Sequence, residues 1–128
     1  MSEKNYNLKV WSETHKKMSE VFTEKEYLEN IKYNFILQDP TPILKYESPF
    51  KTSEGNSLFQ NDYISIENKL DDRYIIGLIV LTPDGFIIQN VFNHTDISDT
   101  SKSESNIIAK IGSVEETPTL VADLLRGL

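Results

Sequence analysis

The sequence predicts an α+β fold, in which an antiparallel sheet with a central hairpin at about residues 74–93 packs against an N-terminal helical segment and a C-terminal helix. The hairpin is predicted by two apolar, β-branched runs joined by a Pro-Asp-Gly turn. The helices are predicted by apolar residues at helical spacing near both ends of the chain. At 128 residues, without cysteine, the chain is expected to fold as a single domain, 1–128.

The N-terminal quarter combines a strand pattern with a helical pattern. Residues 6–10 alternate between apolar and polar side chains, which predicts a strand. Ser12 is then a suitable N-cap, and residues 13–34 are expected to be helical, either continuously or with a break at Thr23. Thr23 and Glu26 have the spacing of a capping box. Helical spacing before and after the break is shown by Met18, Val21, Phe22, Leu28, Ile31 and Phe35.

The middle of the chain is expected to be extended or irregular. Pro40 and Pro42 exclude a helix interior, because each proline lacks a backbone donor and restricts the residue before it. A short strand is expected at 43–47, a long loop at 48–61 and a second strand at 63–67.

The clearest local pattern is the hairpin that follows. Residues 74–81 are almost entirely apolar, residues 82–85 (Thr-Pro-Asp-Gly) form a turn, and residues 86–92 return as a second apolar run. Because both strands are apolar on both faces, we expect the hairpin at the centre of the sheet, covered by helices.

The C-terminal part is predicted to contain a polar linker or long surface loop at 95–105, followed by a helical segment at 106–128. Within that segment, residues 106–111 suit a strand or a helical turn. Thr117 as N-cap and Gly127 at the C-terminus bracket a final helix, which either covers the chain's own sheet or docks into a partner. Its apolar face is Leu120, Val121, Leu124 and Leu125.

The net charge of −7 points to the kind of partner. Residues 1–32 are balanced, so the surplus of acid lies in residues 33–128. Such a surface repels nucleic-acid phosphates and suits a protein with a basic face. The start of the chain has no signal-peptide pattern, and no apolar run is long enough for a bilayer, so a cytoplasmic protein that does not bind membranes is expected.

No motif commits the chain to a chemistry. There is no cysteine, no nucleophile elbow and no phosphate-binding glycine pattern. His15 is expected on a solvated surface, and His94 with Asp96 supplies too few ligands to hold a metal. We therefore expect no catalytic residue, metal or cofactor, and an enzyme with a dispersed site is the least favoured alternative.

Seven residues are candidates for binding a partner. The two aromatic candidates, Phe50 and Trp11, are of types that serve as interface anchors, although packing within the domain is the alternative. The other five would form a C-terminal acidic face: Asp96, Asp99, Glu104, Glu115 and Glu116.

The residue usage also carries a resemblance. The chain is rich in Lys, Glu, Asn and Ile, as in SEKNYNLKVWSETHKK at its start, and it is small and acidic. In these respects it resembles the small acidic accessory proteins of T4-type phages, including those that bind host RNA polymerase. The net charge, the residue usage and the lack of a catalytic set predict a non-enzymatic accessory or inhibitory factor in the host cytoplasm that acts on a nucleic-acid machine. The resemblance places RNA polymerase first among the possible partners, before other nucleic-acid-handling proteins. An antitoxin or immunity-type protein that neutralises a basic toxin or nuclease is the alternative.

Overall fold

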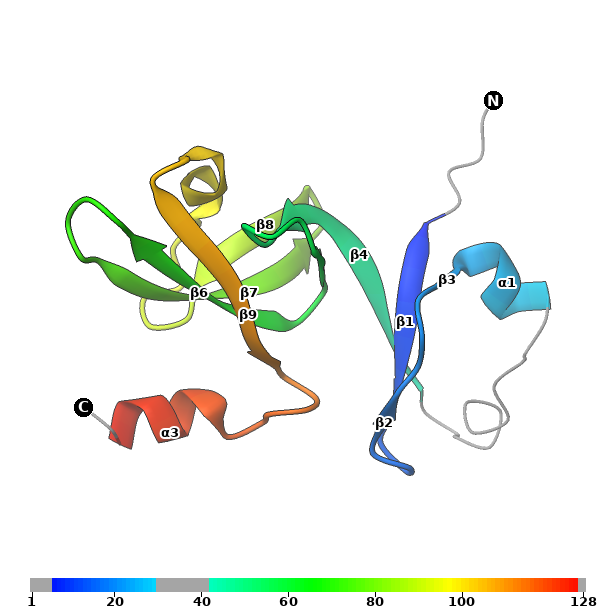
Figure 1. Ribbon diagram of the computed structural model, residues 1–128. Helices are drawn as coiled ribbons and strands as arrows, with labels where there is room; N and C mark the ends of the chain where they lie inside the picture. The colour runs from blue at the N-terminus through cyan, green and yellow to red at the C-terminus, as the bar shows by residue number, and fades with distance from the viewer. Residues whose placement is uncertain (1–5, 30–41, 127–128) are drawn as a thin grey trace. The chain divides into compact units, whose positions relative to one another are not determined.

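The computed structural model describes residues 6–29 and 42–126, and it is mostly β, with two antiparallel sheets (Figure 1). The chain divides into two compact units, residues 1–47 and 48–128, with the boundary inside strand β4 (Ile43–Lys51). Within the described residues, neither hydrophobic core includes a helical side chain. The predicted α+β packing of helices on one sheet is therefore wrong, because strands and loops cover the apolar faces instead.

The first unit is built around strand β1 (Asn7–Ser12). It pairs antiparallel with β2 (Lys17–Met18), β3 (Phe22–Thr23) and β4. Alternation along β1 turns one set of side chains inward, as the sequence pattern predicts. The core of this unit contains Leu8, Val10 and Phe22, with Leu44 and Tyr46 packed against them.

The helical prediction for residues 13–34 is wrong over residues 13–23. Ser12 Oγ does accept the His15 N–H, at 3.2 Å, but the contact belongs to the turn between β1 and β2. Ser side chains cap turns as readily as helices, so this signal was ambiguous. Phe22 pairs opposite Leu8 in the sheet, and residues 30–34 lie outside the described part of the chain.

The capping box at Thr23 and Glu26 is confirmed. Glu26 N–H donates to Thr23 Oγ1 at 3.1 Å, and Thr23 N–H donates to Glu26 Oε1 at 3.0 Å. These reciprocal bonds satisfy two backbone donors that a helix start leaves open, and α1 (Glu24–Glu29) begins there.

The second unit contains a four-stranded antiparallel sheet in the order β8-β7-β6-β9. The strands are β6 (Asp62–Asn68), β7 (Tyr74–Thr82), β8 (Gly85–Asn90) and β9 (Asn106–Ser113). The predicted β7–β8 hairpin is confirmed, and Gly85 takes the positive φ, 122°, that its turn requires. However, β8 lies at the edge of the sheet rather than at its centre.

The predicted loop at 48–61 is wrong in part, because it contains the end of β4 and strand β5 (Ser57–Phe59). A tight turn joins them, in which Gly55 has a φ of 90° and Thr52 N–H donates to Asn56 C=O at 2.9 Å. The strand predicted at 43–47 is confirmed as the first part of β4, which continues to Lys51, whereas the three-residue strand β5 was not predicted.

One face of the sheet forms the core of the second unit. Gly77 allows close packing there, because a Cβ at this position would lie 2.8 Å from Ile88 Cγ2. Phe50 and Ile97, from the segments before β5 and after β8, pack against this core. The buried residues of the core are Leu58, Ile64, Ile66, Ile79, Ile88 and Ile108.

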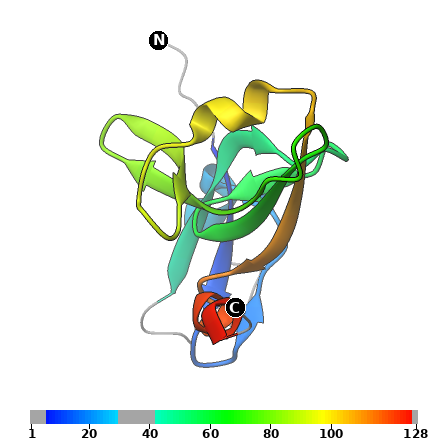
Figure 2. The ribbon, with the colours of Figure 1, turned by 90° about the vertical axis from the view of Figure 1, so that its left-hand side faces the viewer.

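Helical structure in the second unit is short. The β8–β9 connection contains the 3₁₀ helix η1 (Ser98–Lys102), which lies across the strands in Figure 2 (yellow). Residues 106–113 form strand β9, so of the two alternatives for 106–111 the strand is correct. The final helix, α3 (Leu120–Arg126), is confirmed, but Thr117 is not its N-cap, because Thr117 Oγ1 bonds to Ser113 instead. None of the residues of α3 is buried. Within residues 6–29 and 42–126, no helix is long and apolar enough to cross a membrane.

Candidate partner-binding surface

The β8–β9 connection (residues 91–105) is anchored to the edge strand β8. Ile97 N–H donates to Ile88 C=O at 2.7 Å, and Ile88 N–H donates to Ser98 Oγ at 2.9 Å. Asn90 N–H donates to Thr95 C=O at 2.8 Å. These bonds satisfy backbone groups that an edge strand would otherwise expose, so the connection is part of the folded unit.

Three of the predicted acidic residues lie on this connection. Asp96, Asp99 and Glu104 are exposed, and the side chain of Asp99 is 97% exposed. Lys102 Nζ lies 3.5 Å from Asp99 Oδ1, but both groups are solvated, so the pair neutralises little of the acidic charge. The connection therefore displays carboxylates on a backbone held in place by hydrogen bonds.

Asp96 also fixes the local backbone. Its Oδ1 accepts the Ser98 hydroxyl at 2.5 Å and the Ser98 N–H at 2.8 Å. These two bonds, the hydroxyl first, favour the charged carboxylate and lower the pKa of Asp96 below its ordinary value. Because the folded pKa is depressed, this interaction stabilises the fold above the ordinary pKa of aspartate, about 3.9, and the contribution is lost as the pH falls through the folded value.

The Ser98→Ala variant tests this assignment. Removal of the hydroxyl should raise the pKa of the Asp96 carboxyl toward its ordinary value, because the larger of its two stabilising bonds is lost. The measurement is an NMR pH titration of the Asp96 carboxyl carbon. Ser101→Ala is the matched control, since Ser101 Oγ donates to Ser98 C=O and does not bond Asp96. Equal pKa values in wild type and Ser98→Ala would contradict the assignment.

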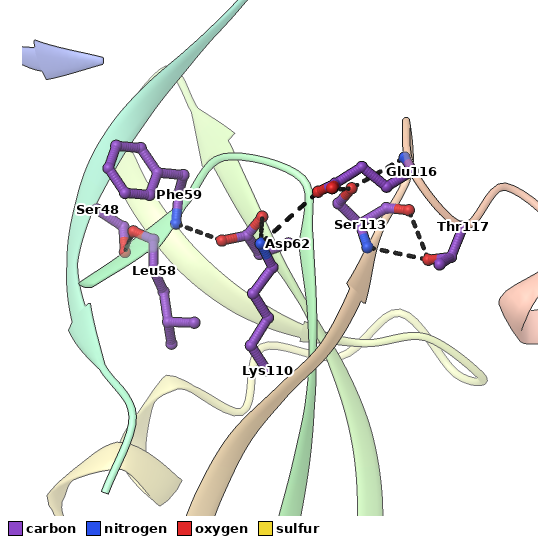
Figure 3. A network of polar contacts seen from close by, with 8 residues as sticks. All are labelled: Ser48, Leu58, Phe59, Asp62, Lys110, Ser113, Glu116 and Thr117. Carbon is purple, nitrogen blue, oxygen red and sulfur yellow. Dashed lines mark hydrogen bonds and ion pairs between the residues drawn. The ribbon is translucent and has the colours of Figure 1, made fainter. Parts of the chain in front are cut away.

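The other two predicted acids have structural contacts in the turn after β9. Glu116 Oε1 accepts the Ser113 hydroxyl at 3.1 Å, and Glu116 N–H donates to Ser113 Oγ at 3.0 Å (Figure 3). Both carboxylate oxygens of Glu115 are inaccessible to solvent. Glu115 therefore differs from the exposed acids of the β8–β9 connection in its burial, whereas Glu116 is exposed but is bonded within its own turn.

A buried carboxylate that sequence reasoning missed lies beside this turn. Asp62 is fully buried, and its Oδ2 accepts the Phe59 N–H at 2.7 Å. Lys110 Nζ lies 3.7 Å from Asp62 Oδ1 and 3.8 Å from Glu116 Oε1 (Figure 3). The network joins the β5–β6 turn to β9. In the sequence, Asp62 is a single acidic residue between two apolar runs. The same pattern is typical of a solvated turn, so the sequence does not indicate that Asp62 is buried.

The two predicted aromatic anchors are packed within their own units. Trp11 is buried in the first unit, and its Nε1 donates to Glu13 Oε2 at 2.8 Å. Phe50 is half-buried against the core of the second unit. Of the seven predicted residues, three are exposed and lie together on one segment, the β8–β9 connection: Asp96, Asp99 and Glu104.

His94, the residue considered for chemistry, lies in the same connection. It is exposed, has a φ of 62°, and its N–H donates to Asn90 C=O at 2.8 Å. Among the described residues, no group of three or more His, Asp or Glu side chains is arranged to hold a metal ion.

Comparison with known proteins returns no matching family model and no matching curated protein.

Proposed function

We propose that the chain is a non-enzymatic, protein-binding regulator that uses the exposed acids of the β8–β9 connection to bind a basic protein surface. The observation that carries the proposal is the placement of Asp96, Asp99 and Glu104 on a connection that is hydrogen-bonded to β8. Because this backbone is already ordered, binding costs less conformational entropy than it would for a free loop.

The charge of the second unit supports the same proposal. Residues 48–128 contain twelve acidic and six basic residues, a net charge of −6 of the total −7. A field of this sign accelerates encounter with a basic partner and disfavours direct contact with nucleic acid. Proteins that handle nucleic acids carry the complementary basic surfaces.

RNA polymerase is the partner that we propose first, since the residue usage and size of the chain resemble those of phage accessory proteins that bind it. In this proposal the chain acts in the cytoplasm of a bacterial host. Activation and inhibition are both compatible with an acidic binding surface.

The test is binding of the full chain to purified bacterial RNA polymerase at several ionic strengths. We expect saturable binding that weakens as salt rises, since the Debye length falls from about 30 Å at 0.01 M to about 8 Å at 0.15 M. Bovine serum albumin, an acidic protein, is the control ligand and should not bind. Absence of saturable binding to the polymerase at low salt would overturn the proposal of this partner.

A further inference from the structure

A polar hollow of about 380 Å³ lies in the second unit, and the end of the β8–β9 connection forms part of its wall. It forms where four segments meet: the end of β4 with the turn that follows it, the start of the β6–β7 turn, the end of η1 with the residues after it, and the start of β9. Backbone bonds hold these segments together, from Lys69 N–H to Ser105 C=O at 3.0 Å and from Ser53 N–H to Ile108 C=O at 2.9 Å. The lining residues with charged side chains are Lys51, Lys69, Lys102 and Glu104.

The charge of this hollow is opposite to that of the unit around it. Lys51, Lys69 and Lys102 are three of the six basic residues in 48–128, and the lining contains one acid, Glu104. The local charge is thus +2 within a unit of −6. Half of the basic residues of this unit therefore lie around one concavity. The positive potential there can attract a small anion.

The three ammonium groups are only weakly engaged. Lys51 Nζ lies 3.4 Å from Ser57 Oγ, and Lys102 contacts the solvated Asp99 carboxylate at 3.5 Å. Within the described part of the chain, Lys69 Nζ has no carboxylate at ion-pair distance. These cations therefore need not break strong contacts to bind an anion.

Hydroxyl groups add further donors to the walls. Ser53 Oγ accepts the Ile108 N–H at 2.8 Å, and Ser103 Oγ accepts the Ser105 N–H at 3.3 Å. In each case the oxygen is used as an acceptor, which leaves the hydroxyl proton free to donate. Ammonium and hydroxyl donors around one hollow match the several acceptor oxygens of a phosphate group.

We propose that this hollow binds the phosphate group of a small phosphorylated molecule, with the organic part of the ligand against Ile107. Ile107 is 38% exposed and supplies apolar surface on the lining. The volume is near the lower end of ligand pockets, roughly 300–1,000 Å³, which suits one small molecule. A nucleic-acid strand fits less well, since its successive phosphates would meet the net −6 surface of the unit. This site does not depend on the proposed protein partner, although Glu104 belongs to both surfaces.

The test is a titration of the full-length ¹⁵N-labelled chain, followed by NMR, with inorganic phosphate, adenosine monophosphate and adenosine as separate probes. We expect saturable shifts at amides of residues 51–53, 69 and 101–108 with both phosphates, and none there with adenosine. Adenosine monophosphate should bind more tightly than inorganic phosphate, because its organic part adds contact with Ile107. Equal affinity would overturn the organic-ligand part of the proposal, and adenosine shifts at the same amides would overturn phosphate recognition.

Charge variants of the hollow sharpen the test. Lys69→Gln should weaken phosphate binding about three- to tenfold, as expected for partly solvated ion pairs. Glu104→Gln should tighten it about two- to fivefold, because the one acid of the lining is neutralised. Arg126→Gln, which removes a cation outside the hollow, should leave the affinity unchanged. The spectra themselves report whether each variant is folded. Shifts absent at about 10 mM phosphate, or an affinity that Lys69→Gln does not change, would overturn the site.

Discussion

The Leu58→Ala variant should lower the free energy of unfolding of residues 48–128 by about 2–5 kcal/mol. Leu58 is 0% exposed and belongs to the core of the second unit, although it comes from the short strand β5 rather than from the four-stranded sheet. Truncation removes buried apolar surface and leaves a cavity that the surrounding isoleucines cannot fill without rearrangement. A loss of this size is large compared with the stability of a small domain, about 5–15 kcal/mol.

Leu70→Ala is the matched control, because it makes the same substitution at a residue that is 82% exposed. Its effect should lie within about 0.5 kcal/mol of zero. Trp11, the only tryptophan, lies in the first unit, whereas the substitution lies in the second. Native-state hydrogen exchange at the amides of β6 and β7 is therefore the appropriate measurement. Equal protection in the two variants would show that β5 is not part of this core.

The Asp62→Ala variant should destabilise the same unit by about 2–3 kcal/mol. The substitution leaves the Phe59 N–H without its 2.7 Å acceptor in a buried place and removes the link to Lys110. Much of the loss should come from the unsatisfied backbone donor, because Lys110 is partly exposed and can turn to solvent.

Asp62→Asn separates these two contributions. Asparagine keeps a side-chain oxygen that can accept from Phe59 N–H but has no charge for Lys110, so we expect less than half of the loss seen with alanine. Urea unfolding followed by far-UV circular dichroism, together with amide exchange, measures both variants. If asparagine and alanine cost the same, the ion pair rather than the backbone hydrogen bond would be the main contribution of Asp62.

The elements that the sequence predicted correctly are those with local causes. The β7–β8 hairpin follows from Pro83 and Gly85, whose backbone preferences act within the turn itself. The start of α1 follows from the reciprocal bonds of Thr23 and Glu26, which are three residues apart. Neither prediction needs knowledge of distant parts of the chain.

The elements that it missed depend on pairing between distant residues. Met18 and Phe22 have helical spacing, but Met18 pairs with Trp11 and Phe22 with Leu8 in the first sheet. Strand preference depends on what a residue packs against, and that is decided by the tertiary structure. The edge position of β8 was missed for the same reason. Its apolar residues suggested a central strand, but the loop that contains Ile97 packs against the same core and covers part of the apolar surface.

The candidate surface was predicted in sign but not in detail. Counting charges locates the surplus of acid correctly, since charge is a sum over residues. It does not distinguish Asp99, which is exposed, from Asp62, which is buried, or from Glu116, which bonds within a turn. The burial of a residue depends on the topology of the chain, which cannot be predicted from composition. The cationic hollow was missed because Lys51, Lys69 and Lys102 are far apart in sequence.

In the proposed function, the exposed acids of the β8–β9 connection form the partner-binding surface. Two double variants of equal charge change test it: Asp99→Lys with Glu104→Lys, and Glu67→Lys with Asp84→Lys. Asp96 is left intact because it orders the backbone, and the control acids are exposed residues elsewhere in the same unit.

The decisive measurement is the affinity of these two double variants for purified bacterial RNA polymerase at one ionic strength. The first variant should bind at least about tenfold more weakly than wild type, and the second less than about threefold more weakly, because only the first reverses charge at the proposed interface. Equal losses in the two variants would mean that the chain responds to net charge alone, and would contradict the assignment of the surface to residues 96–104.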